Sequence, residues 1–361
     1  MNQYKKYGQY FSNQLFNKND LDMLILFVTS VCNQKCTTCF VHDRLNKPQE
    51  DLKFEEFEKI SKKIGNFRLL LLSGGEPFIS RDLVKLCSMF FINNNVTTLS
   101  IPTNASLTKK VLEDVETLLK RFPHVTISIN ASLDGLGERH DEIRKMKNAF
   151  GMAMKTLESL GHLREKYPNL EIRVNSVIHK DNFEEMEKLS VHLKKYKLNQ
   201  HVFELMRGDP PSDEMKKIEL DQAEKIHKFI VDNTRHYLDK EIKNPLTRIL
   251  KKVSFLGSLN YIHHLKELAI SKKQWPVECV AGKNIMIIYS NGDVPLCELR
   301  TVIGNVRDYD YNIHELLKTQ KAKEQFNEAK TCSCTHICFI NTTISKKTNS
   351  IFKIPLYYFK K

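Results

Sequence analysis

Strand-like and helix-like segments alternate along the first 206 residues, and this alternation limits the possible folds more than any other feature. Short apolar runs rich in β-branched residues lie at 23–29, 68–73, 96–102, 124–130, 170–178 and 200–206. Between these runs, apolar residues recur at helical spacing. The pattern predicts successive βα units and a parallel sheet covered by helices, either doubly wound or curled into a barrel. In both folds, functional residues are expected at the carboxyl ends of the strands.

Three cysteines follow the first predicted strand. In the stretch TSVCNQKCTTCF, Cys32, Cys36 and Cys39 are separated by three residues and then by two. Three thiolates leave one iron of an iron–sulfur cluster open to a ligand that is not protein. A zinc site is the alternative, with His42 as the local candidate for a fourth ligand, but structural zinc usually has four protein ligands. The loop therefore predicts an iron–sulfur cluster.

Cysteine usage and hydropathy indicate the compartment. Eight of the nine cysteines fall into two groups, and Cys87 lies alone on a helical segment, where we expect buried packing. No window approaches the roughly 18 apolar residues that cross a bilayer, and the N-terminal segment lacks the apolar run of a signal peptide. We therefore expect a cytoplasmic protein whose grouped cysteines bind metal or clusters and do not form disulfides.

The net charge of +13 favours an anionic partner, which could be a substrate, a nucleic acid or an anionic membrane surface. Much of the excess lies in lysine pairs that are typical of solvated helix faces. No basic motif with interleaved aromatic residues indicates single-strand binding, and we expect no DNA partner. The stretch 248–259 and the tail 341–361 combine basic and apolar residues, so they could pack in the core or contact a membrane surface.

Further motifs lie at successive strand ends. They are Ser73-Gly74-Gly75-Glu76-Pro77, Pro102-Thr103-Asn104, Ser132-Leu133-Asp134-Gly135 and, on the fifth strand, Asn175. Each motif alone could be an ordinary turn. Together with the cysteine loop, they resemble the radical S-adenosylmethionine superfamily, in which CxxxCxxC, GGEP, TNG and SLDG elements occur in this order.

This resemblance implies a partial (β/α)6 barrel of the TIM type and two cofactors, a 4Fe-4S cluster and S-adenosylmethionine. The open iron would bind the amino and carboxylate groups of S-adenosylmethionine, and Glu76 with the neighbouring backbone would hold its ammonium. The residues implied to bind S-adenosylmethionine are Gly74, Gly75, Glu76, Asn104, Ser132 and Asn175. Two positions differ from the family pattern: Ala105 replaces a glycine, and Thr38, followed by Cys39 and Phe40, replaces an aromatic residue that covers the adenine.

The resemblance also implies the reaction. Reductive cleavage of S-adenosylmethionine would give a 5′-deoxyadenosyl radical that takes a hydrogen atom from the substrate. The electron would come from a donor such as flavodoxin or ferredoxin. Strand-end loops carry barrel chemistry, so Glu204, Arg207 and Asp209 after the sixth strand are expected to face the substrate, with a salt-bridged turn as the alternative.

A second cysteine group lies in the C-terminal part. Cys279 and Cys297 flank an apolar run, 285–289, and the turn residues 291–293, so we expect a hairpin that brings both thiols to one end. The later thiols are Cys332, Cys334 and Cys338. The arrangement is similar to SPASM or twitch extensions, and five cysteines suffice for one auxiliary 4Fe-4S cluster. A structural zinc site is the alternative.

The expected organisation has five parts. They are an N-terminal segment (1–22), the barrel (23–206), a helical connection (207–276), a twitch-like or SPASM-like auxiliary-cluster domain (277–340) and a basic, apolar tail (341–361).

Three function classes fit this organisation. The first is a radical enzyme acting on a small or lipid-linked metabolite, such as a sugar or cyclitol carbinol. The second is radical maturation of a ribosomally made peptide. The third is a non-catalytic iron–sulfur or RNA-binding protein. Peptide-modifying relatives often carry an N-terminal recognition domain, and few residues precede the first strand here, so the sequence favours the metabolite.

Overall fold

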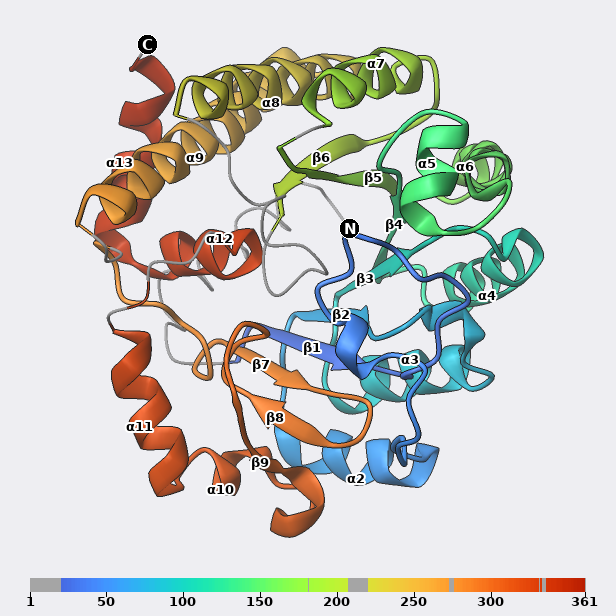
Figure 1. Ribbon diagram of the computed structural model, residues 1–361, viewed down its shortest axis with the longest axis vertical. Helices are drawn as coiled ribbons and strands as arrows, with labels where there is room; N and C mark the ends of the chain where they lie inside the picture. Colours follow the sequence, from blue (N-terminus) through green and yellow to red (C-terminus); the bar gives the residue numbers. More distant parts are fainter. Residues whose placement is uncertain are drawn as a thin grey trace.

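The computed structural model describes residues 21–180, 182–206, 220–272, 276–330, 332 and 336–360. Its centre is a seven-stranded parallel sheet in the order β6-β5-β4-β3-β2-β1-β7. The strands are β1 (Met23–Phe27), β2 (Leu69–Ser73), β3 (Thr98–Thr103), β4 (Thr126–Ser132), β5 (Leu170–Ile178), β6 (Gln200–Leu205) and β7 (Ile285–Ile288). Figure 1 shows the strands in a curved row with helices outside. The expected partial barrel is confirmed.

Amphipathic helices follow the strands and cover the outer face of the sheet. They are α2 (Phe54–Ile64), α3 (Leu83–Asn93), α4 (Thr108–Arg121), α5 (Glu138–Arg144), α6 (Ala149–Lys166) and α7 (Phe183–Leu193). In α4, for example, Val111, Val115 and Leu118 are fully buried, which is the spacing of one helix face. Cys87 is also fully buried, on α3, so its predicted packing role is confirmed.

The strands present different side chains to their two faces because successive residues point to opposite sides. In β5, Ile172 and Val174 are fully buried, whereas Glu171, Arg173 and Asn175 line the cavity inside the barrel. The inner face of the barrel is therefore polar along β5, which is unusual for a packed core and typical of a binding site.

The strand β7 corrects the hairpin expectation. Ile285–Ile288 pairs in parallel with β1 and is buried along its whole length, as a strand covered on both faces should be. The turn at Gly292 is present, with φ of +89°, but the next strand, β8 (Asp293–Pro295), pairs antiparallel with β9 (Val302–Asn305). The apolar run thus extends the barrel sheet and does not form a separate two-stranded ladder.

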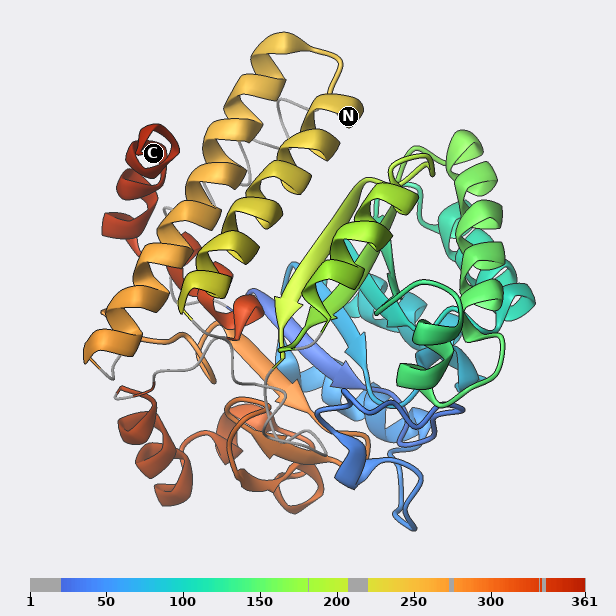
Figure 2. The same ribbon diagram turned by 45° about the horizontal axis from the view of Figure 1, so that its top comes forward.

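Two long helices, α8 (Leu220–Glu241) and α9 (Pro245–Lys272), lie beyond β6, as Figure 2 shows. Asn233 of α8 donates to the carbonyl oxygen of His201 in β6 at 2.9 Å. The last helix packs on α9, where Asn260 donates to the carbonyl oxygen of Tyr357 at 2.9 Å. The remaining helices are α10 (Ile313–Leu316), α11 (Gln320–Ala329), α12 (Ile337–Lys346) and α13 (Thr348–Phe359), and the short 3-10 turns are η1 (His42–Arg44), η2 (Pro77–Ile79) and η4 (Val306–Tyr309).

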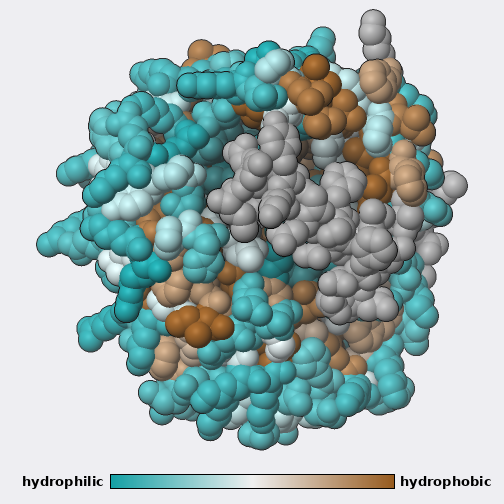
Figure 3. All heavy atoms as spheres, turned by 180° about the vertical axis from the view of Figure 1, so that it is seen from behind, coloured by the Kyte–Doolittle hydropathy of each residue, from teal (hydrophilic) through white to brown (hydrophobic). Residues whose placement is uncertain are grey.

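The face drawn in Figure 3 is mostly hydrophilic where it is coloured, with some apolar groups. On the face in Figure 3, apolar side chains gather in the upper right part. Exposed large apolar residues include Leu246, Ile249 and Leu250 of α9 and Phe352, Leu356 and Phe359 of α13. None of the described helices combines the length and apolarity that a membrane crossing needs. Contact with a membrane surface stays a prediction.

Candidate active site

The three cysteines of the predicted cluster loop lie beyond the carboxyl end of β1 and line one cavity. All three are free thiols, and the backbone N–H of Cys39 donates to the carbonyl oxygen of Cys36 at 3.3 Å. Burial, together with the thiols of Cys36 and Cys32, raises the pKa of Cys39 to about 11. Thiols that are hard to ionise in the protein alone fit a cationic iron cluster, which stabilises thiolates.

The first cysteine is held by its neighbours in the loop. The N–H of Cys32 donates to Asn46 Oδ1 at 3.0 Å, and Asn46 Nδ2 donates back to the carbonyl oxygen of Cys32 at 3.0 Å. Just before it, the backbone N–H and the hydroxyl of Ser30 both donate to Asp51 Oδ2, at 2.8 and 3.0 Å. These bonds hold the backbone of the loop on both sides of Val31 and do not involve the thiol of Cys32.

The glycine motif packs directly on the cysteine loop. The N–H of Gly75 donates to the carbonyl oxygen of Thr29 at 2.8 Å, and the N–H of Glu76 donates to that of Val31 at 2.9 Å. Gly74 has φ of +122°, and a Cβ there would lie 2.3 Å from the carbonyl oxygen of Thr29. Positions 74 and 75 both need glycine, since a side chain at either would collide with the backbone that leads into Cys32.

Glu76 has a different environment from the one expected. It is 1% exposed, and its Oε1 accepts from the Thr103 hydroxyl at 2.7 Å and the Phe78 N–H at 3.2 Å. Its Oε2 accepts from the Asn104 N–H at 2.7 Å. Burial outweighs these bonds and raises the pKa of Glu76 to about 7. The carboxylate joins the ends of β2 and β3, and the expected contact of Glu76 and the neighbouring backbone with an ammonium group stays a prediction.

Asn104 connects the third strand end to the cysteine loop. Its Nδ2 donates to Asn33 Oδ1 at 2.7 Å, and Asn33 Nδ2 donates to the Ser106 hydroxyl at 2.9 Å. The next residue, Ala105, is fully buried and has φ of +56°. This is the left-handed region that glycine adopts readily, so Ala105 has a backbone conformation to which a glycine is suited.

Ser132, the last residue of β4, and Asn175 in the second half of β5 lie side by side, since they are register partners. Both line the same cavity as the cysteines, and so do Asn104 and the glycine motif. Thr38 and Phe40, the two positions considered for the adenine, line it as well. The structure thus brings all the predicted residues of the cysteine loop and the S-adenosylmethionine site to one cavity of about 3010 Å³. Their roles as ligands stay predictions.

Arg144 at the end of α5 is a site residue that the sequence reasoning missed. Its Nη1 lies 3.6 Å from Cys36 Sγ, and its Nη2 lies 2.6 Å from Asp134 Oδ2. Asp134 belongs to the SLDG motif and is fully buried. The available signal was that Arg144 follows His140 and Ile143 at helical spacing, and those two residues form the buried face of α5.

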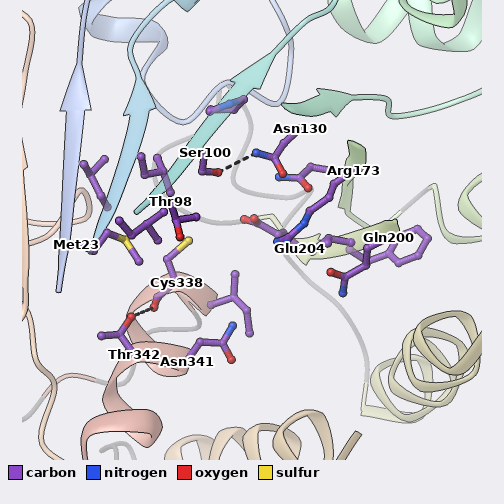
Figure 4. Close-up of a pocket in the computed structure, with 18 of the residues that line it drawn as sticks. Met23, Thr98, Ser100, Asn130, Arg173, Gln200, Glu204, Cys338, Asn341 and Thr342 are labelled. Carbon is purple, nitrogen blue, oxygen red and sulfur yellow. Dashed lines mark hydrogen bonds between the residues drawn. The ribbon is translucent and has the colours of Figure 1, made fainter. Parts of the chain in front are cut away.

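Of the three predicted substrate residues, one lies within the part of the chain that the structure describes. Glu204 lines the cavity, whereas Arg207 and Asp209 lie outside the described residues. In Figure 4, Glu204 and Arg173 extend toward one another inside the barrel. Arg173 Nη2 also lies 2.6 Å from Glu171 Oε2, and Asn130 Nδ2 donates to the Ser100 hydroxyl at 2.8 Å. Polar groups from β3 to β6 therefore form one wall of the cavity.

The C-terminal cysteines do not all face the same way. Cys279, Cys297 and Cys332 line a second cavity of about 570 Å³. Cys338, at the start of α12, lines the main cavity instead and points toward Thr98, as Figure 4 shows. Cys334 lies outside the described residues. Three of the five predicted ligands thus line one cavity, and the role of all five as cluster ligands stays a prediction.

Comparison with known proteins follows the same division between barrel and extension. Residues 26–192 match the family model described as Radical SAM superfamily. Fe-coproporphyrin III synthase of Methanosarcina barkeri is 24% identical over 232 residues, which cover 62% of this chain and 54% of that protein. The chain therefore spans about half the length of this curated relative.

Two solved structures share the fold over most of the chain. The structure of anSMEcpe with bound AdoMet and Cp18Cys peptide has a TM-score of 0.58 at 17% identity and covers 94% of this chain and 97% of its own. SuiB of Streptococcus suis bound to S-adenosylmethionine has a TM-score of 0.59 at 17% identity, with 85% and 68% covered. At this identity, the likeness concerns the fold, including the C-terminal extension of the barrel.

Proposed function

The chain belongs to the radical S-adenosylmethionine superfamily, and from this premise we propose that it is a radical enzyme that modifies a peptide. Membership implies a 4Fe-4S cluster, S-adenosylmethionine and a reductant, and it sets aside the non-catalytic alternative. The cluster and S-adenosylmethionine, when bound, supply a 5′-deoxyadenosyl radical that abstracts hydrogen. We propose flavodoxin or ferredoxin as the reductant.

The residues of this chain then have separate tasks. Cys32, Cys36 and Cys39 would hold the cluster, and the carbonyl groups of Gly74 and Gly75 would accept from the methionine ammonium. Ser132 and Asn175 would bind the ribose or the carboxylate, since both line the same cavity as the three cysteines. Glu76 would act indirectly by fixing the loop between these groups.

The size of the cavity carries the choice of a peptide. Sites for small molecules usually occupy about 300–1000 Å³, and this cavity measures about 3010 Å³. Space therefore remains after S-adenosylmethionine is bound, enough for a segment of polypeptide. Among the solved structures that share the fold, anSMEcpe holds a peptide and SuiB has been solved with its precursor peptide SuiA. These observations favour the peptide over the metabolite that the sequence reasoning preferred.

The wall of the cavity that is formed by polar groups from β3 to β6 would contact the substrate. Asn130, Arg173, Gln200 and Glu204 point into it from three neighbouring strands. Amide, guanidinium and carboxylate groups can form hydrogen bonds with a peptide backbone and with its polar side chains. Leaving such a group buried without a partner would weaken binding. We propose that this wall positions one residue of the peptide for hydrogen abstraction.

The second cavity would hold an auxiliary cluster. Cys279, Cys297 and Cys332 surround it, and burial raises the pKa of Cys297 to about 12. As in the first site, such thiols fit a cationic metal centre as their partner. We propose a 4Fe-4S cluster with a fourth ligand from the closing cysteine group. A structural zinc ion is the alternative, which metal analysis would distinguish.

The test is mass spectrometry of an anaerobic reaction with reductant and S-adenosylmethionine. Candidate peptides encoded beside the gene are compared, as substrates, with sugars and cyclitols that the enzymes encoded by neighbouring genes would make or use. We expect one peptide to change mass. The change should be accompanied by an equal amount of 5′-deoxyadenosine, or by transfer of hydrogen between the peptide and 5′-deoxyadenosine. A modified sugar or cyclitol, with every peptide unchanged, would replace the peptide by the metabolite.

A further inference from the structure

We propose that Arg144, held in place by Asp134, raises the reduction potential of the cluster at Cys32, Cys36 and Cys39 through its contact with Cys36. This inference rests on the assignment of the three cysteines as cluster ligands. It does not depend on the identity of the substrate, and it gives Asp134 and Arg144 a positioning and tuning role.

The guanidinium is enclosed between its two partners. The side chain of Arg144 is 12% exposed and that of Asp134 is 1% exposed. Arg144 Nη2 lies 2.6 Å from Asp134 Oδ2, and Arg144 Nη1 donates to Cys36 Sγ at 3.6 Å. The pair therefore forms a buried dipole whose positive end faces the sulfur.

Asp134 itself cannot turn away easily. Its Oδ1 accepts from the backbone N–H of Val177 in β5 at 2.9 Å, and its own N–H donates to His140 Nδ1 at 3.1 Å. His140 is fully buried on α5. Moving the carboxylate would leave a buried backbone N–H and a buried charge without partners, which is strongly unfavourable.

A backbone contact independently fixes the distance between Arg144 and Cys36. The N–H of Thr37, the residue after Cys36, donates to the carbonyl oxygen of Ile143, the residue before Arg144, at 2.9 Å. Immediately after Arg144, Lys145 has φ of +52° and ends α5. The end of the helix is thus bound to the cysteine loop, so the contact between the side chains follows from the path of both backbones.

The positive charge of Arg144 changes the reduction potential of the cluster in one direction. Arg144 remains a cation, because a guanidinium group is not deprotonated in proteins and here it lies against the carboxylate of Asp134. Reduction adds one negative charge to a cluster, and hydrogen bonds to cluster sulfurs and nearby positive charge stabilise that charge. Such effects are larger in a buried site than in water. Arg144 therefore makes the cluster easier to reduce by its donor.

The test compares cluster potentials in the full chain without S-adenosylmethionine or substrate. The reconstituted parent, Arg144→Gln and Arg144→Lys are titrated with dithionite and followed by electron paramagnetic resonance. The relevant signal is the one that is missing when Cys32, Cys36 and Cys39 are replaced by Ala. The matched control is Arg139→Gln, because Arg139 lies on the same helix, is exposed and pairs only with Glu142 at 3.0 Å among the contacts described.

We expect Arg144→Gln to keep its iron and to shift the midpoint to lower potential, with about a tenfold lower ratio of reduced to oxidised cluster at a fixed potential. Arg144→Lys keeps the charge but loses the planar donor, so its shift should be smaller. Arg139→Gln should match the parent.

An unchanged midpoint in Arg144→Gln at equal iron content would overturn the proposal. So would weaker binding of S-adenosylmethionine with an unchanged midpoint, because Arg144 would then act on the cofactor alone. If Arg144→Gln does not hold the cluster, Arg144→Lys decides, and a midpoint equal to that of the parent overturns the proposal. Failure of the peptide assay leaves these measurements intact, since they contain no substrate.

Discussion

The Cα of Gly75 lies so close to the cysteine loop that a Cβ atom there would be 2.0 Å from the carbonyl oxygen of Val31. The loop that follows Val31 begins with Cys32, so the glycine motif and the cluster loop share one packed backbone interface. A change in one must displace the other.

Gly75→Ala should therefore destabilise the fold by about 1–3 kcal/mol and lower the iron bound by the cysteine loop. The control is Gly161→Ala on α6, where the nearest atom to a new Cβ is at 3.6 Å. That change should be neutral or slightly stabilising, since alanine favours a helix. Urea denaturation and iron analysis give the answer, and equal iron content in Gly75→Ala and the parent would contradict the interface.

The carboxyl group of Glu76 should make stability depend on pH. Its pKa is raised from 4.5 to about 7, so between these values the folded state holds a proton that the unfolded chain has released. This contribution favours folding at the acid end and is lost as the pH rises through that window. The free energy of unfolding of the parent should therefore fall relative to Glu76→Gln from about pH 4.5 to 7. A constant difference would show that burial does not raise this pKa.

The auxiliary site should bind four of the irons. Replacing Cys279 and Cys297 together by Ala should lower the iron content from about eight to about four per chain, with the cluster at Cys32, Cys36 and Cys39 retained. Mössbauer spectra of reconstituted protein and zinc analysis make the comparison. Four irons and one zinc in the parent would identify a structural zinc site and remove the redox role.

The carboxylate of Glu204 should matter for the substrate and not for S-adenosylmethionine. We expect Glu204→Gln to lower kcat/KM for the peptide about tenfold through a lost charge-assisted hydrogen bond, with unchanged binding of S-adenosylmethionine. Glu187→Gln, at an exposed position of α7, is the control. Full activity of Glu204→Gln would support the alternative of a structural turn after β6.

The sequence predicted the strands of the barrel well because each buried strand has a local pattern. It placed Ile285–Ile288 in a hairpin because an apolar run does not say which strand it will join. That choice is decided by pairing with β1, far away in the chain. A buried run of four apolar residues fits an inner or covered edge strand as well as a hairpin.

The candidate site was predictable where a motif fixes the backbone and less so where side chains choose their partners. The glycines and cysteines fell on one cavity as expected. The motif did not reveal that Glu76 would bind Thr103 and Asn104, because both partners come from the next strand end. Arg144 did not stand out in the sequence because it lies at a helix end that is rich in basic residues. The spacing of the cysteines could not show that Cys338 lines the main cavity.

The most direct test of the account is the formation of 5′-deoxyadenosine by a variant in which Cys32, Cys36 and Cys39 are all replaced by Ala. Parent and variant are reconstituted anaerobically, reduced and incubated with S-adenosylmethionine, with iron counted in both. We expect the variant to lose about four irons and to form no 5′-deoxyadenosine above the buffer control, with the auxiliary cluster retained. Undiminished formation of 5′-deoxyadenosine by the variant would contradict it.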